Sequence, residues 1–488
     1  MSLDKIKHIV VLMMENRSLD NMLGYLYADQ GNKPAHVIPP GSAPLYDGLA
    51  YFPPRDPSNP FWNPVNAAFF SGGPSGRAYV SREAENTVVP DPDPEESFAN
   101  MTYQLFGPHT PSPDAPDQMK GFYIDYARAS STPEQIMQMY SPSRQANVIN
   151  ALARHYAVSD QWSCSSPTQT WPNRAFVHCG TSSGRVDNWP YDPFQYDVPT
   201  IFNTLEAVGV SWKVYNDTEL ISLTRAQLPK LWDPLLEGHF HGFDRFKEDA
   251  RNGDLPDYTF LEPSFQIEPN DDHPPHDIRA GEQFIFDAWQ AVVTGKHANE
   301  TLLLITYDEH GGCYDHAKTL FGATTPDSAS DPGQHGFRFD RFGVRVPTLL
   351  ISPYIAAGTV FRAPQATPCT PFDHTSVLST LQEWKSIPWD KMPQSRRIPH
   401  APTLTSVLTL DKPREDLPEL DRPQVPPAAL QRADDLPLND LQKSLVVATE
   451  TRRKGAPLIA EEREALLLQI RTRADSRAYM LKYGRREQ

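Results

Sequence analysis

The sequence predicts an α/β protein in which a mainly parallel central sheet is flanked by helices on both faces. Several short apolar runs have the length and the β-branched content of fully buried parallel strands. Helical patterns lie between these runs, and strands that alternate with helices form a parallel sheet covered on both faces. One such run alone is compatible with a buried helix segment, but a series of them, most ending in polar or turn residues, favours strands.

The predicted elements are spread over most of the chain. The predicted strands are 8–14, 157–161, 210–215, 258–262, 302–307 and 346–352, and the predicted helices include 200–208, 278–294 and 375–384. Residues 31–112 are rich in Pro, Gly, Asn and Ser and hold few periodic patterns, which predicts a loop-rich insertion. Near the end of the chain, 439–454 and 460–483 have the pattern of two terminal helices.

Length and composition predict the domain organisation. We expect a catalytic domain over 1–400 that contains the insertion at 31–112, a Pro-rich linker at 401–438 and a C-terminal helical extension at 439–488. Proline accounts for 49 of the 488 residues, about twice its usual share of ~5%. Many rigid, non-helical connections should therefore join the regular elements. The four cysteines form no C-x-x-C pair, which excludes a zinc ribbon and a disulfide scaffold.

The charge balance excludes some partners. The chain carries 61 acidic and 45 basic side chains, a net charge of −16, whereas nucleic acids and anionic membranes attract basic surfaces. The apolar run at 9–14 is too short to span a bilayer or to form the core of a signal peptide. We therefore expect a soluble protein with no nucleic-acid partner and no transmembrane segment. As it stands the sequence indicates the cytoplasm, with secretion open if a signal was removed or by a signal-independent route.

Side chains with oxygen ligands end two of the predicted strands. The first predicted strand runs into Glu15 and Asn16, and the fifth runs into Asp308 and Glu309. In open α/β sheets, ligands bind beyond the carboxyl ends of the strands. The four residues could therefore converge on one hard cation. Each pair alone is more typical of helix or turn capping, but the two together, the second followed by two glycines, favour a metal site.

Thr170 is the candidate nucleophile. It lies in a polar segment just before Pro172, a residue that suits the first turn of a helix. A helix N-terminus attracts phosphate, and coordination to a cation lowers the pKa of a hydroxyl, so a metal-bound Thr170 could attack phosphorus. On this segment alone, capping of the helix by Thr170 is the more common explanation.

Histidines are the candidates for moving protons. A phosphoryl-transfer site needs a general acid for the leaving oxygen and donors for the equatorial oxygens, and histidine can serve as both. His273 is the first candidate because it follows a predicted strand in a polar loop. The other histidines near polar or Gly-rich sequence are His109, His310, His316 and His374, and weaker candidates are His178, His239 and His241.

These motifs, taken in order, resemble those of a known family. The segment IKHIVVLMMENRSLD at 6–20 looks like the opening signature of the bacterial phospholipase C/acid phosphatase phosphoesterase family. TWPNR at 170–174 resembles its nucleophile segment, and LITYDEHGG at 304–312 is similar to its second metal segment. Further matches continue the order to about residue 385. At the second metal segment, the family often has two aspartates where this chain has Asp308 and Glu309.

The resemblance implies an alkaline-phosphatase-like fold and hydrolysis of phosphate esters through a phosphorylated enzyme. By this resemblance Glu15, Asn16, Asp308, Glu309 and Thr170 would hold the metal, and Thr170 would also be the nucleophile. His273 and, with less support, His109 would contact the phosphoryl oxygens or the leaving group. All five metal ligands offer oxygen, which favours one divalent Ca²⁺ over Mg²⁺ or Mn²⁺ and makes Zn²⁺ the weakest candidate.

The predicted activity is that of a phospholipase C acting on phosphatidylcholine-type phospholipids. Diacylglycerol would leave first, and water would then release the phosphorylated head group from a phosphothreonine. The substrate would be a phospholipid or a small phosphate ester, with transient contact with a membrane surface. An acid phosphatase that acts on monoesters with the same nucleophile is the alternative. A non-catalytic binding protein with this fold would be expected to lack Thr170 or the metal ligands, and all are present.

Aromatic residues gather between residues 51 and 70 of the insertion. They allow three interpretations: a cage for a choline cation, a rim that touches lipid, or ordinary packing of a long insertion.

Overall fold

The structure is a computed structural model that describes residues 3–31, 33–49, 80–116, 118–217, 221–364, 370–427 and 436–484. The aromatic stretch at 51–70, with its three interpretations, lies outside the described residues. Three of the cysteines, Cys164, Cys179 and Cys313, are described, and all three are buried and free.

Nine strands of the described residues form one sheet, in the order β2-β9-β3-β8-β7-β1-β6-β4-β5. Only β8 runs antiparallel to its neighbours, which confirms the prediction of a mainly parallel sheet. The strands are β1 His8–Met14, β2 His36–Ile38, β3 Ala157–Ser159, β4 Trp212–Asn216, β5 Phe240–Gly242, β6 Tyr258–Glu262, β7 Thr301–Tyr307, β8 Thr348–Ile351 and β9 Thr359–Phe361.

All six predicted strands are present, and no end differs from its prediction by more than two residues. The sequence patterns did not reveal β2, β5 and β9, which have three residues each. Strands this short carry too few side chains for a periodic pattern to stand out from a loop.

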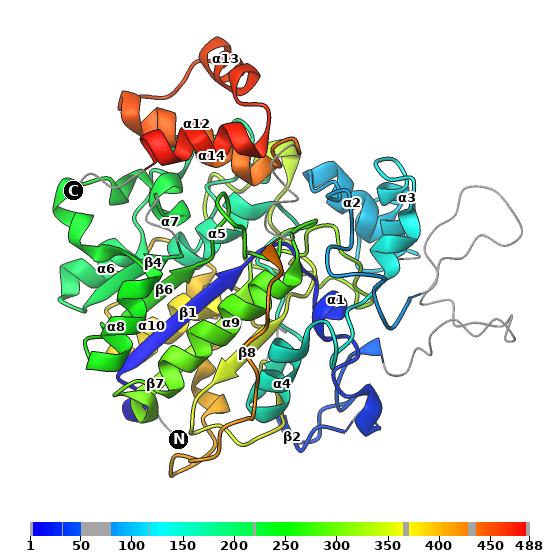
Figure 1. The fold of residues 1–488 in the computed structure, drawn as a ribbon, viewed down its shortest axis with the longest axis vertical. Coiled ribbons are helices and arrows are strands. Elements are labelled where there is room, and N and C mark those ends of the chain that lie inside the picture. The colour runs from blue at the N-terminus through cyan, green and yellow to red at the C-terminus, as the bar shows by residue number, and fades with distance from the viewer. Residues whose placement is uncertain are drawn as a thin grey trace, which may run out of the picture.

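Helices cover both faces of the sheet, as predicted (Figure 1). α4, α8 and α9 pack over one face, and α5, α6 and α10 pack over the other. The helices of the core and the insertion are α1 Leu19–Leu23, α2 Phe98–Phe106, α3 Phe122–Tyr126, α4 Asn147–His155, α5 Thr170–Cys179, α6 Ile201–Val208, α7 Leu223–Gln227, α8 Phe243–Asn252, α9 Ile278–Val293 and α10 Thr375–Lys385. None of the described helices is long and apolar enough to cross a membrane.

The insertion and the C-terminal extension differ in detail from the sequence-based expectation. The insertion contains α2, which begins after Ser97, whose hydroxyl accepts a hydrogen bond from the Asn100 N–H. The described part of the extension, 439–484, has three helices where two were expected: α12 Asp440–Lys454, α13 Ala460–Gln469 and α14 Arg473–Tyr483. The break falls where Thr472 caps α14 by accepting from the Asp475 N–H, because a capping residue begins a new helix.

The extension packs against the central domain. In Figure 1, α12, α13 and α14 lie together in orange and red at the top of the molecule, with α7 beneath α12. Leu441, Leu445 and Ala448 on α12 belong to the same hydrophobic core as the sheet. Burial of apolar surface against that core stabilises the docked position of the extension.

Candidate active site

The register of the sheet brings the two predicted metal-binding pairs together. Met14 at the end of β1 is paired with Tyr307 at the end of β7, so that Glu15 and Asp308 follow side by side. The Asn16 N–H donates to Asp308 Oδ1 at 3.0 Å, and the Asp308 N–H donates to the Met14 carbonyl at 3.2 Å. Glu15, Asn16, Asp308 and Glu309 are all fully buried. The structure therefore places all four at one edge of the sheet.

A glycine allows this approach. Asn16 has a left-handed backbone, with φ of 56°, as the chain turns away from β1. Gly311, with φ of 58°, follows the second pair, and a Cβ there would lie only 2.2 Å from the Asn16 carbonyl oxygen. Only glycine fits a position with both a positive φ and so close a neighbouring backbone.

Thr170 joins this group from α5, a helix that covers one face of the sheet. It is the first residue of α5, it is 1% exposed, and its Oγ1 donates a hydrogen bond of 3.3 Å to Glu15 Oε2. The N-cap of α5 is Gln169, so capping does not account for the Thr170 hydroxyl. The hydroxyl is directed at the predicted metal ligands instead.

Arg174, one turn further along α5, orients Glu15. Its Nε donates to Glu15 Oε1 at 2.7 Å and lies 3.9 Å from Asp308 Oδ2. With Oε1 held by Arg174, Oε2 faces Thr170. Arg174 is part of the TWPNR motif, but no role was predicted for it from the sequence. Its spacing of four residues from Thr170, which places both on one helix face, was the available signal.

The predicted metal-binding side chains are buried, and some of their oxygen atoms lack hydrogen-bond partners. Burial raises the pKa of Glu15 and of Glu309 well above the ordinary range, and the positive charge of Arg174 offsets part of this for Glu15. Among the described residues, three buried oxygen atoms of this group have no hydrogen-bond partner: Asn16 Oδ1, Asp308 Oδ2 and Glu309 Oε1. Buried oxygen atoms without partners are costly unless a cation or a donor meets them. An all-oxygen group of this kind fits a divalent cation.

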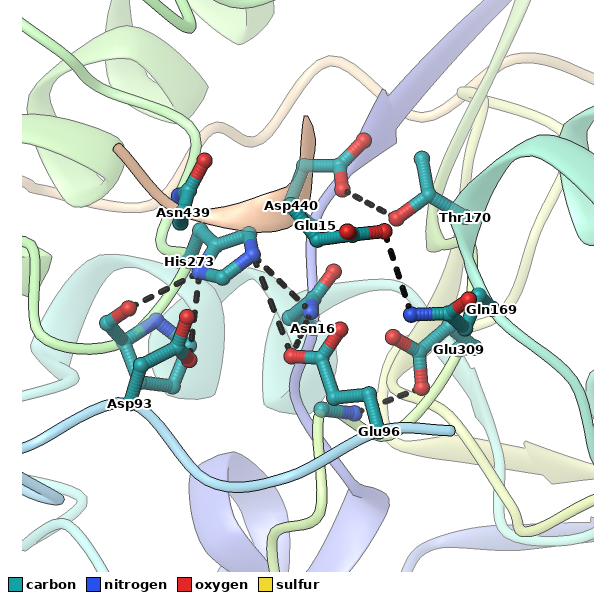
Figure 2. A network of polar contacts seen from close by, with 12 residues as sticks. Glu15, Asn16, Asp93, Glu96, Gln169, Thr170, His273, Glu309, Asn439 and Asp440 are labelled. Atoms are coloured by element: carbon teal, nitrogen blue, oxygen red, sulfur yellow. Dashed lines mark hydrogen bonds and ion pairs between the residues drawn. The ribbon is translucent and has the colours of Figure 1, made fainter. Parts of the chain in front are cut away.

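The structure brings His273 to the same place (Figure 2). Its Nδ1 donates to the Pro274 carbonyl at 2.8 Å, and its Nε2 lies 3.2 Å from the side-chain nitrogen Nδ2 of Asn16. Burial lowers the pKa of His273 to about 3, so the ring is neutral at pH 7. With Nδ1 as the donor, Nε2 is the acceptor that faces the site.

Two carboxylates that the sequence analysis missed complete this side of the site. Glu96 Oε1 accepts from the Asn16 side-chain amide at 2.5 Å and lies 3.8 Å from His273 Nε2. Asp93 Oδ1 lies 3.6 Å from His273 Nδ1. Asp93, Glu96 and His273 offer ligand atoms that all lie within 4.8 Å of one another. The run PDPDPEE at 90–96, inside a segment treated as a loop-rich insertion, was the only sequence signal.

The other predicted histidines have different surroundings. His109 is half-buried and follows the C-terminal end of α2. Glu96 lies before the other end of this nine-residue helix, which is about 13 Å long. His374 Nε2 donates to the backbone carbonyl of Asp308 at 2.6 Å. The remaining candidates make structural contacts: His178 with Thr224, His310 with Gln104, His316 with Asp20, His239 with Trp212 and His241 with Tyr215.

A cavity of about 540 Å³ lies beside the candidate site and is lined by Asp93, Glu96 and Gln169 among others. Its wall includes residues of the insertion, Gln169 next to Thr170, and residues of the C-terminal extension. In Figure 2 Asn439 and Asp440 are drawn on the upper side of the site, and Glu96 is drawn on the lower side next to Asn16. The wall carries two basic side chains, Lys443 and Arg473, against the carboxylates of Asp91, Asp93, Glu95, Glu96, Asp187 and Asp440.

The sequence was compared with known families and proteins. The family model described as "Phosphoesterase family" matches residues 6–388. Non-specific phospholipase C3 of Arabidopsis thaliana is 33% identical over 92% of this chain and 82% of that protein. Non-specific phospholipase C1 of the same plant is 35% identical over 85% of this chain and 73% of that protein. Phospholipase C B of Mycobacterium tuberculosis is 27% identical over 87% of this chain and 81% of that protein.

The structure was compared with solved structures as well. A protein of the alkaline phosphatase superfamily from Vibrio parahaemolyticus matches with a TM-score of 0.30 and 13% identity, over 54% of this chain and 62% of that chain.

Proposed function

The chain belongs to the phosphoesterase family and is a phosphoric ester hydrolase, and from this premise we propose that it is a phospholipase C. Its substrates are phosphatidylcholine-type phospholipids, and its products are diacylglycerol and the phosphorylated head group. The observation that carries the proposal is the hydrogen bond from Thr170 Oγ1 to Glu15 Oε2. It lies next to three buried oxygen atoms that have no hydrogen-bond partner among the described residues.

Thr170 acts as the nucleophile. Its oxygen attacks phosphorus while its proton passes to Glu15 Oε2, and the diacylglycerol oxygen departs with a proton from His273. The ring is neutral in the free protein. The negative charge of a phosphodiester bound next to Nε2 raises the pKa of His273, so that the ring takes up from solvent the proton that this step needs. Water then attacks the phosphothreonine and gives a proton to His273, and Glu15 returns its proton to the Thr170 oxygen. The phosphorylated head group is released and both residues are restored.

Glu15, Asn16, Thr170, Asp308 and Glu309 would hold one divalent cation. When bound, such a cation lowers the pKa of the threonine hydroxyl and offsets the charge that develops on the phosphoryl oxygens. The all-oxygen donor set favours Ca²⁺ over Mg²⁺ or Mn²⁺, with Zn²⁺ the weakest candidate. His273 stays outside this donor set, and His109 remains a secondary candidate for contact with the leaving group.

The cavity supports a diester substrate over a monoester. A cavity of about 540 Å³ is in the range of sites for drug-sized ligands. Its carboxylates outnumber its basic groups, so it favours a phosphodiester with one negative charge and a cationic head group. A phosphomonoester with two negative charges would be repelled more strongly.

The experiment compares three substrates: phosphatidylcholine in vesicles, p-nitrophenyl phosphorylcholine and p-nitrophenyl phosphate. We expect kcat/KM for p-nitrophenyl phosphorylcholine to exceed that for p-nitrophenyl phosphate by at least about tenfold, and vesicles to yield diacylglycerol. Thr170→Val measured in parallel corrects for contaminating hydrolases. Faster hydrolysis of the monoester would instead identify an acid phosphatase with the same nucleophile.

A further inference from the structure

The C-terminal extension reaches the residues that surround the nucleophile. Asp440, the first residue of α12, accepts hydrogen bonds from three side chains: Gln169 Nε2 at 3.2 Å, Asn188 Nδ2 at 2.8 Å, and the Tyr191 hydroxyl. These residues are 249 to 271 positions earlier in the sequence. Gln169 immediately precedes Thr170, so the extension contacts the nucleophile segment directly.

Asp440 determines which way two amide groups face. An ionised carboxylate only accepts hydrogen bonds, so it holds the NH₂ ends of Gln169 and Asn188. Their oxygen ends must then point the other way. Asn188 Oδ1 accepts from the Trp171 N–H at 2.8 Å, and Gln169 Oε1 accepts from the Asn188 N–H at 2.8 Å. The carboxylate therefore specifies the orientation of both amides.

This network satisfies the start of α5. The first N–H groups of a helix have no partner within the helix, and the N-cap Gln169 provides no side-chain hydrogen bond to them. Asn188 supplies the partner of the Trp171 N–H instead. Thr170 lies between Gln169 and Trp171, and both of these neighbours are connected to Asp440. The position of the Thr170 hydroxyl next to Glu15 depends on that turn.

We propose that Asp440 is a positioning residue for Thr170. Acting through Gln169 and Asn188, it holds the first turn of α5 in the geometry that directs Thr170 Oγ1 at phosphorus. This inference rests on the proposed function, in which Thr170 is the nucleophile. Asp440 does not touch the reacting atoms, because its carboxylate oxygens are occupied by the three donors.

The test uses the full chain with Asp440→Asn, Asp440→Ala and the control Lys454→Gln. Lys454 is at the other end of α12, where it pairs with Glu462 away from the cavity. Both amides donate to Asp440 Oδ2, so Asp440→Asn can keep an oxygen towards them while its NH₂ group faces the Tyr191 hydroxyl, which can accept. Asp440→Ala removes every acceptor. A misplacement of about 1 Å can lower catalysis by about 10²-fold. We expect kcat on p-nitrophenyl phosphorylcholine to fall at least about tenfold in Asp440→Ala and to stay within about threefold of wild type in Asp440→Asn, which retains the acceptor.

Hydrogen exchange gives a readout that is independent of activity. Without the Asp440 acceptor the Asn188 amide is free to turn away from the Trp171 N–H, so exchange of this N–H should accelerate in Asp440→Ala and stay unchanged in Asp440→Asn and Lys454→Gln. A double-mutant cycle with Asn188→Ala and Asp440→Ala should be strongly non-additive in kcat, because both changes break one chain of contacts. Additive losses in this cycle, unchanged exchange in Asp440→Ala, or faster exchange with wild-type kcat in Asp440→Ala would each overturn the proposal.

A parallel Thr170→Val variant separates this inference from the proposed function. If Thr170→Val retains activity, Thr170 is not the nucleophile and the proposed function fails on its own. If Thr170→Val is inactive while Asp440→Ala keeps wild-type kcat, the proposed function stands and the role of Asp440 is refuted.

Discussion

Thr170 Oγ1 donates a hydrogen bond of 3.3 Å to Glu15 Oε2, although 155 positions separate the two residues in the sequence. The contact joins the end of the central strand β1 to the start of α5, and Arg174 fixes the second oxygen of the same carboxylate. A hydroxyl held by a buried carboxylate with a raised pKa is prepared to lose its proton to that carboxylate.

Replacement of the Thr170 hydroxyl should abolish turnover. We expect Thr170→Val, which keeps the shape of the side chain, to lower kcat on p-nitrophenyl phosphorylcholine at least about 10³-fold, because the nucleophile is lost. Thr170→Ser keeps a hydroxyl and should retain measurable activity. Acid quenching during turnover should trap a phosphopeptide containing residue 170 in wild type and none in Thr170→Val. Activity of Thr170→Val near wild type would remove Thr170 as the nucleophile.

Removal of the cation should inactivate the protein, and the variant Glu309→Gln should separate metal binding from stability. Buried carboxylates with raised pKa values repel one another when no cation is present. In a chelator we therefore expect Glu309→Gln to melt at a temperature equal to or higher than that of wild type. With Ca²⁺ at about 100 times its Kd, wild type should gain about 2.7 kcal/mol of unfolding free energy, and the variant much less.

The control for this measurement is Glu300→Gln, because Glu300 pairs with Lys7 and His297 away from the cation ligands. Its response to Ca²⁺ should match that of wild type. Calorimetric titration with Ca²⁺, Mg²⁺, Mn²⁺ and Zn²⁺ would rank the ions. An equal response of Glu309→Gln and wild type to Ca²⁺ would contradict the assignment of Glu309 as a ligand.

Gly311→Ala should disturb the metal site more than a matched glycine change elsewhere. A Cβ at Gly311 would lie 2.2 Å from the Asn16 carbonyl oxygen, whereas a Cβ at Gly322, which also has a positive φ, would meet nothing within 4 Å. Gly322→Ala should therefore cost only the backbone strain of about 1–2 kcal/mol. Gly311→Ala should cost more and also weaken cation binding, because Asn16 must move. Chemical denaturation and calorimetric titration of both variants would measure this, and equal losses would count against the crowding argument.

His316 should make stability depend on pH on the alkaline side. Burial alone would lower the pKa of His316, but the attraction of Asp20 and Asp47, which outweighs the repulsion of nearby Arg345, raises it to about 10. The folded pKa lies above the unfolded value of 6.5, so the stabilisation is complete below about pH 6.5 and is lost as pH rises towards 10. The contribution is on the order of a few kcal/mol.

The check is the unfolding free energy of wild type and His316→Gln between pH 6 and 10. The difference between the two should be largest near pH 6 and should shrink steadily towards pH 10. A difference that stays constant over this range would show that the ring does not change its protonation state with folding.

Much of the site could be predicted because parallel strands end at one edge of a sheet. β1 and β7 were recognisable as apolar runs, so Glu15, Asn16, Asp308 and Glu309 could be placed together from the sequence alone. Thr170 could be associated with them through Pro172 and the motif around it. Glu96 could not, because its position depends on how a Pro-rich segment folds back over Asn16. No period of 2 or 3.6 residues encodes such a path.

The sequence by itself determined the central strands, the residues that end them and the family, because burial imposes a local pattern that can be read residue by residue. Only the tertiary structure decided that Glu96 from the insertion contacts Asn16 and that Asp440 from the extension contacts Gln169 at the candidate site. Their contacts join residues 80 and 271 positions apart. Such contacts depend on how whole segments pack on the core. A local sequence pattern does not specify which distant segment packs there.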